Sequence, residues 1–174
     1  CEVFYNDFRI PLANVVGNLN DGWDVAMATL EIERATASLG ERIEIARVVE
    51  QLIELARTTT DQSGRPVIET GDIAARLGLA RAEAATLRAM SYMTISRVTH
   101  GPLGAEGIIP AVYGTELVQR VHKLAMDIVG VRALAMDGWP KRYLFSRTRT
   151  IAGGTAQIRR NIIGERLLGL PRGR

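Results

Sequence analysis

The segment at residues 70–91, TGDIAARLGLARAEAATLRAMS, decides the fold because its apolar and small residues recur every three or four positions. These residues lie on one face of a helix and are Ile73, Leu77, Ala80, Ala84, Leu87 and Ser91. Thr70 precedes them as a helix cap, so the pattern predicts a helix that begins near Thr70 and ends by His100-Gly101-Pro102. A helix with one long apolar face needs other helices to cover it.

Three further segments show helical patterns and could provide that cover. The first, residues 22–56, carries Ala26, Leu30, Ala37 and Gly40 on one face. The second begins at about Pro110 and carries Leu117, Val121, Leu124 and Ile128. The third runs from Gly154-Thr155 to Gly169 and carries Ile158, Ile162 and Leu167. We expect Gly138-Trp139-Pro140 to end the helix that begins at about Pro110. Four such helices predict an all-α protein, a four-helix up-down bundle.

Residues 1–17, CEVFYNDFRIPLANVVG, have a different character, because β-forming residues alternate there with Asn, Asp and Pro. They predict one strand followed by a loop, and no second strand follows. The chain opens inside this strand without a methionine, so we expect it to be part of a longer protein.

Composition excludes several classes of protein. With 47% hydrophobic and 24% charged residues, the chain is neither disordered nor fibrous. One cysteine and two histidines predict no disulfide framework and no metal site, which fits a reducing, cytoplasmic location. No apolar run approaches the ~18 residues of a membrane span. Charges of both signs are mixed along the chain, the net charge is +3, and few aromatic residues lie among the arginines, so we expect no nucleic-acid partner. The small basic excess fits an anionic ligand, a protein partner or a solvated surface.

Two positions carry candidate chemistry. Gly153-Gly154-Thr155 would let a phosphate or another polar edge of a cofactor approach the free N–H groups of the following helix, although a simple helix start explains the same residues. Glu33, in LEIERATASLG at residues 30–40, lies on the face of Leu30 and Ala37. Desolvation there would raise its pKa and suit it to act as a base; the alternatives are an ion pair or a solvated rim position.

Two longer segments resemble one enzyme family. EVFYNDFRIPLANVVGNLNDGWDVAMATLEIER, residues 2–34, resembles the end of the middle β-domain and the first C-terminal helix of acyl-CoA dehydrogenases. RTIAGGTAQIRRNIIGERLLGLPR, residues 149–172, resembles their closing signature. The resemblance implies the end of a β-domain at residues 1–17 and a C-terminal bundle domain at residues 18–174. It also implies FAD-dependent α,β-desaturation of an acyl-CoA thioester, in which a glutamate removes the α-proton.

The resemblance also assigns site residues. Many family members carry the base immediately before Gly-Thr, where this chain has Gly153; others carry it on the first long helix before an arginine, which corresponds to Glu33. Glu33 is therefore the expected catalytic base. By the same resemblance Glu31, Arg34 and Gly154 contact the substrate, and the flavin contacts are Thr155, Ala156 and Gln157.

Departures from the family pattern concern the neighbouring subunit. Homotetrameric members carry Arg-x-x-Phe-Gly after the first long helix, whereas this chain has Thr60 and Ser63 at the corresponding positions. Homotetrameric members also carry a Gln followed by Gly-Gly on the third helix, and of this second motif the chain keeps only Gly130. We therefore expect a tetramer, either homomeric or heteromeric. The favoured hypothesis is the heteromer, in which a related second subunit supplies the missing FAD contacts, as in the family's heteromeric steroid side-chain dehydrogenases. The resemblance implies electron-transfer flavoprotein as electron acceptor. A non-catalytic partner subunit, an oxidase of the same fold and a helical interaction module remain alternatives.

Overall fold

A computed structural model describes residues 2–36, 39–101, 104–136 and 138–172. The chain divides into two compact units, Cys1–Glu33 and Arg34–Arg174. The first unit contains the 3-10 turn η1 (Leu12–Asn14) and most of helix α1 (Gly22–Thr36). In the described part of the chain, no helix is both long and apolar enough to cross a membrane.

The strand predicted within residues 1–17 is not formed in the described residues 2–17, where η1 is the regular element. Val3, Phe4 and Tyr5 are all exposed. A strand is stable only when neighbouring strands take up its backbone N–H and C=O groups. Across the described ranges the structure has no sheet, and its β-type pairing is an isolated bridge between Thr60 and Pro66. The strand prediction is therefore wrong for this chain taken alone.

Within the range predicted as one helix, residues 22–56, the structure describes the helical segments α1 and α2 (Leu39–Thr58). Ala37, predicted on the apolar face of this helix, lies outside the described residues. At the start of α1, the backbone carbonyl of Asp21 accepts hydrogen bonds from the N–H groups of Asp24 and Val25.

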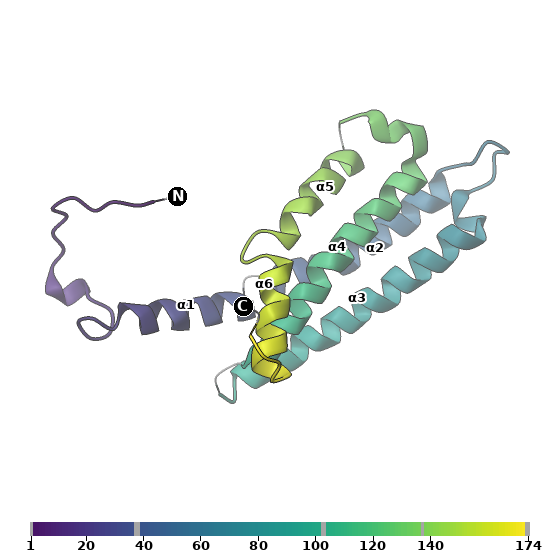
Figure 1. Cartoon of the computed structure of the whole chain (residues 1–174). Coiled ribbons are helices and arrows are strands. Elements are labelled where there is room, and N and C mark those ends of the chain that lie inside the picture. The colour runs from purple at the N-terminus through teal and green to yellow at the C-terminus, as the bar shows by residue number, and fades with distance from the viewer. Residues whose placement is uncertain (1, 37–38, 102–103, 137, 173–174) are drawn as a thin grey trace. The chain divides into compact units, whose positions relative to one another are not determined.

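The second unit is the expected helical bundle. Helices α2, α3 (Gly71–Val98), α4 (Ile108–Val129) and α5 (Gly138–Ser146) run in alternating directions, joined by loops and by the 3-10 turns η2 (Val67–Glu69), η3 (Ala105–Gly107) and η4 (Gly130–Leu134) (Figure 1). After α5 come η5 (Arg147–Thr150), α6 (Ala156–Ile162) and the π-helical turn η6 (Ile163–Leu167). The all-α fold predicted from the sequence is confirmed.

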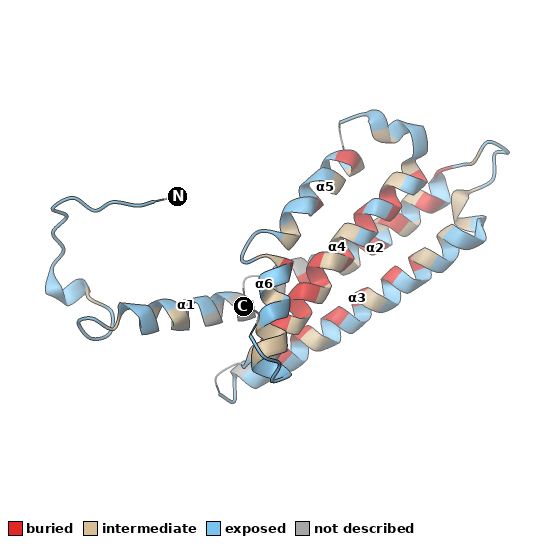
Figure 2. Ribbon diagram, viewed as in Figure 1, coloured by how far each residue is buried: buried red, intermediate tan, exposed pale blue. Residues whose placement is uncertain are grey.

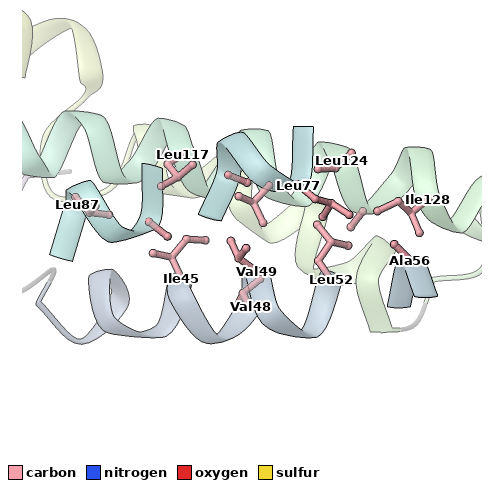
Figure 3. Close-up of a cluster of buried hydrophobic side chains, with 14 residues drawn as sticks. Ile45, Val48, Val49, Leu52, Ala56, Leu77, Leu87, Leu117, Leu124 and Ile128 are labelled. Atoms are coloured by element: carbon pink, nitrogen blue, oxygen red, sulfur yellow. The ribbon is translucent and has the colours of Figure 1, made fainter. Parts of the chain in front are cut away.

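The core of this unit lies between α2, α3 and α4, and Figure 2 shows the buried residues on their facing sides. In Figure 3 the labelled side chains of α2 point toward those of α3 and α4. The buried cluster consists of Ile45, Val48, Val49, Leu52, Ala56, Leu77, Ala80, Ala84, Leu87, Leu117, Val121, Leu124, Ala125 and Ile128. It includes four of the six residues predicted on the α3 face and all four predicted on α4; Ile73 packs against it half-buried and Ser91 is buried outside it. The helical period therefore identified most of these contacts.

Helix α5 differs from the prediction, because Gly138-Trp139-Pro140 begins a helix and does not end one. Pro140 is the third residue of α5, where its missing N–H breaks no helical hydrogen bond, and it is buried. The stop signal lies earlier, at Gly130, whose φ of +61° ends α4.

Candidate functional site

Thr155 caps helix α6 through its side chain. Its backbone is extended, with φ −62° and ψ 153°, and its Oγ1 accepts a hydrogen bond from the N–H of Ile158 at 3.2 Å. The two preceding residues, Gly153 and Gly154, have φ of +65° and +98°, and the second value is one that a residue with a side chain rarely adopts. The Gly-Gly pair thus permits a sharp reversal of the chain directly before the helix.

Arg159 holds this reversal from inside the helix. Its Nη2 donates hydrogen bonds to the backbone carbonyls of Ala152 and Gly153, at 3.1 Å in each case. A Cβ added to Gly153 would lie 3.2 Å from the same Nη2, so the guanidinium occupies the space beside residue 153. We call this arrangement the Arg159 clasp. Sequence reasoning missed it, although an arginine four residues after a helix cap is close enough to fold back on the cap.

The start of α6 fits the polar edge of a flavin and offers nothing to a metal. Ala156 is buried, Thr155 is half-buried and the side chain of Gln157 is exposed. Backbone N–H groups in the first turn of a helix have no intrahelical acceptor, and nothing lies within 4 Å of a Cβ built on Gly154. Since α6 has only seven residues, these donors matter more than a helix dipole. No cluster of three potential metal-ligating residues occurs among the residues described.

Glu33 lies on α1, in the first compact unit. Its side chain is exposed, Ala26 is exposed and Leu30 is 37% exposed. The described residues therefore do not provide the apolar surroundings expected for Glu33. The backbones of Glu31 and Arg34 belong to α1, while their side chains lie outside the described part of the structure.

The predicted flavin contacts and Gly154 are brought together at the start of α6, in the second unit. Glu33 and the start of α6 belong to different units, and the catalytic role of Glu33 stays a prediction.

Thr60 and Ser63 lie in a turn that satisfies its own polar groups. Asp61 Oδ1 accepts hydrogen bonds from the N–H and hydroxyl of Ser63, at 2.8 and 2.6 Å, and from the N–H of Arg65 at 3.0 Å. The hydroxyl of Ser63, and then the backbone N–H of Arg65, hold the pKa of the Asp61 carboxyl below its usual value. The polar atoms of Ser63 and Asp61 are thus directed toward the turn itself.

Residues 20–168 match the family model described as acyl-CoA dehydrogenase, C-terminal domain. The chain belongs to the acyl-CoA dehydrogenase family. It is 38% identical to acyl-CoA dehydrogenase IpdE1 of Mycobacterium tuberculosis, over 98% of this chain and 44% of that relative. Its fold is similar to that in the ChsE4-ChsE5 complex from Mycobacterium tuberculosis, with a TM-score of 0.79 and 28% identity over 98% of this chain and 46% of that one.

A further similar structure is a variant of Tcur3481-Tcur3483, described as a steroid ACAD (acyl-CoA dehydrogenase). Its TM-score is 0.77, and its sequence is 25% identical over 98% of this chain and 46% of that one. The chain thus spans less than half the length of the relatives it matches. The family and the C-terminal helical fold implied by the sequence resemblance are confirmed.

Proposed function

We propose that this chain is the C-terminal part of an FAD-dependent dehydrogenase that introduces an α,β double bond into an acyl-CoA thioester, with Glu33 as the base that removes the α-proton. FAD-dependent dehydrogenation of acyl-CoA is the general activity of the family. FAD, when bound, accepts the hydride from the β-carbon. The observation that carries the proposal is the closing segment, which keeps its capped helix start but has no carboxylate at residue 153.

The absence of an acid at residue 153 supports assigning the base to α1. The loop before α6 has glycine at this position, and its carbonyl accepts a hydrogen bond from Nη2 of Arg159. Glu33 is an exposed carboxylate at the other position that the family uses. In this proposal, Gly154 lets the thioester approach closely, and Thr155, Ala156 and Gln157 meet the flavin. Glu31 and Arg34 are proposed to line the path of the CoA thioester.

Substitution of Glu33 by Gln in the full-length protein tests this role. The amide keeps the shape of the side chain and cannot take a proton, so turnover of the preferred acyl-CoA should fall by about 10²–10⁴-fold. The flavin absorption spectrum and the stoichiometry of bound FAD should stay unchanged. Asp24→Asn, at an exposed acid on the same helix, is the matched control. Retained turnover and retained exchange of the α-proton with D₂O in Glu33→Gln would refute the assignment.

We also propose that the protein works with a related second subunit on a steroid or branched acyl-CoA and passes electrons to electron-transfer flavoprotein. The support is the similarity to the ChsE4-ChsE5 complex and to a steroid ACAD, together with the self-contained turn at Thr60 and Ser63. Co-expression with candidate dehydrogenase-like chains, followed by measurement of FAD per chain, tests the partner. One FAD per chain and full turnover without a partner would contradict it.

A second candidate is a non-catalytic partner subunit, which the similarity to the two-component ChsE4-ChsE5 complex favours. In that case Glu33→Gln would leave the activity of the assembled complex unchanged, and substitution of the partner's base would abolish it. An oxidase of the same fold would instead produce hydrogen peroxide from oxygen at a rate equal to substrate turnover.

A further inference from the structure

The loop at residues 151–154, which joins η5 to the start of α6, is not held in place by burial of its own side chains (Figure 1). All four residues are exposed, and Ile151, the large apolar side chain among them, is 65% exposed. The position of such a segment depends mainly on hydrogen bonds made at its ends. The Arg159 clasp acts from the α6 side of the loop, and a second tether acts from the η5 side.

Gln119 of α4 supplies this second tether. Its Nε2 donates a hydrogen bond to Oγ1 of Thr150, the last residue of η5, at 2.9 Å. Both residues are half-buried, so water competes less for this bond than at an open surface. The backbone of Gln119 is itself well fixed, because Leu117 and Val121 on either side of it are 0% and 1% exposed in the core. Thr150 is therefore attached to a rigid part of the bundle.

Arg147 fixes which end of the Gln119 amide faces Thr150. Its Nη1 donates to Oε1 of Gln119 at 3.1 Å, and its guanidinium carbon lies 4.5 Å from the centroid of the Tyr143 ring. A guanidinium has only donors, so the amide turns its oxygen toward Arg147 and its NH₂ group toward Thr150. The Thr150 hydroxyl in turn donates to the carbonyl of Arg147 over a longer 3.4 Å. Each group thus has the partner that its chemistry requires.

The position of Thr150 determines where the loop leaves the bundle. Directly after Thr150, the N–H groups of Ile151 and Ala152 donate to the carbonyl of Thr148 in η5, at 3.1 and 2.9 Å, which ties the first half of the loop to η5. The loop then ends at Thr155, whose cap sets the first turn of α6. A shift of η5 on α4 would therefore move the backbone at the start of α6.

We propose that Gln119 is a positioning residue for flavin binding. By holding Thr150 on α4, it sets where the loop at residues 151–154 leaves the bundle and where the first turn of α6 lies. The inference rests on the proposed function, which brings the flavin to Thr155, Ala156 and Gln157. Gln119 acts through Thr150 and not by contact with the flavin.

Titration of the full-length apoprotein with FAD, together with any partner subunit that it requires, tests this role by flavin fluorescence. Gln119→Met keeps the length of the side chain and removes both of its hydrogen bonds; Thr150→Val keeps the shape and removes the hydroxyl. Each should raise the Kd of FAD about fivefold, the effect of one net hydrogen bond. Because both act through the same bond, the double variant should bind FAD no more weakly than Gln119→Met alone. Thr150→Ser, which keeps the hydroxyl, should retain the wild-type Kd.

Gln51→Met is the matched control. Gln51 of α2 is half-buried like Gln119, and its Oε1 accepts a hydrogen bond from Nη1 of Arg142 at 3.2 Å. It joins an arginine to the bundle in the same way, but that arginine belongs to α5 and not to η5. This substitution should leave the Kd of FAD unchanged.

Hydrogen exchange in the apoprotein tests the loop without the flavin. The amides of Ile151 and Ala152 should exchange about fivefold faster in Gln119→Met than in the wild type. The amides of Leu124 and Ala125, in the buried part of α4, should exchange at the same rate in both proteins. Equal acceleration of both pairs would show a general loss of stability and would overturn the positioning role.

The outcomes separate this proposal from the proposed function. If the wild type binds FAD and Gln119→Met binds it equally tightly, or if the two losses add in the double variant, the positioning role is wrong and the proposed function stands. If the wild type binds no FAD, the proposed function fails, and unchanged exchange at Ile151 and Ala152 would show that Gln119 does not hold the loop either. If Gln119→Met does not fold, the difference in Kd between Thr150→Val and Thr150→Ser decides.

Discussion

Replacing Arg159 by Gln should loosen the loop before α6 with little effect on the rest of the bundle. The substitution removes both charge-assisted hydrogen bonds of the Arg159 clasp, to the carbonyls of Ala152 and Gly153. Such bonds contribute ~1.5–3 kcal/mol each when their partners stay buried and unpaired. Here both carbonyls belong to exposed residues and water can replace the donor, so we expect a total loss of about 1 kcal/mol. For a chain of this size, that corresponds to a fall in Tm of about 2–4 °C.

The functional consequence of this substitution is measured on FAD. If the clasp sets the backbone that meets the flavin, about 1 kcal/mol of lost preorganisation raises the Kd of FAD about fivefold. The assay is quenching of flavin fluorescence on titration of the full-length apoprotein, alongside its thermal melt. Arg160→Gln is the control, because Arg160 is a neighbouring arginine of the same helix that pairs with the exposed face of α4 at Glu116. A Kd for FAD that is the same in Arg159→Gln and wild type would refute a positioning role for the clasp.

Three further predictions concern the second unit. Leu52→Ala removes a side chain that is 0% exposed and should lower the free energy of unfolding by about 3–4 kcal/mol in urea titrations, whereas Ile43→Ala, at a 67% exposed position, should change it by less than ~1 kcal/mol. Thr155→Ala removes the cap on the N–H of Ile158 and should cost about 1 kcal/mol; Thr155→Ser should restore it. Burial lowers the pKa of His122 in the folded chain below the 6.5 of a free imidazole. The unfolded chain then binds more protons, so the Tm should fall as the pH drops below about 6.5, and His122→Phe should remove this component.

The sequence predicted α3 and α4 well because both helices are covered along one face. Leu77, Leu87, Leu117 and Leu124 are all buried, as their spacing indicates. When one helix face is covered over several turns, the burial pattern repeats with the helical period and can be read from the chain directly.

The sequence-based prediction of the fold is wrong where a local pattern of residues is compatible with two structures. Glycine and proline at residues 138–140 mark either the end of one helix or the first turn of another, and the structure shows the second. Residues 1–17 have strand-like composition, but a strand is defined by partners that this chain does not contain in its described residues.

The candidate site was predictable to the extent that it depends on neighbouring residues. The cap by Thr155 follows from local sequence and is confirmed by its bond to Ile158. The surroundings of Glu33 depend on surfaces outside its own helix, which a helical wheel does not describe. The spacing of Arg159 from the cap allows the Arg159 clasp, but the carbonyls that the guanidinium meets depend on the positive φ of Gly153 and Gly154.

The ring contact between His122 and Trp139 gives the protein a built-in optical reporter. The two tryptophans fall one in each unit: Trp23 is 73% exposed in the first, and Trp139 is half-buried in the second, with its ring centroid 6.0 Å from that of His122. A protonated imidazole quenches indole emission, and a displaced or newly bonded one alters it. With Trp23 replaced by Phe, the emission of Trp139 would follow proton uptake by His122 in real time, without any added label.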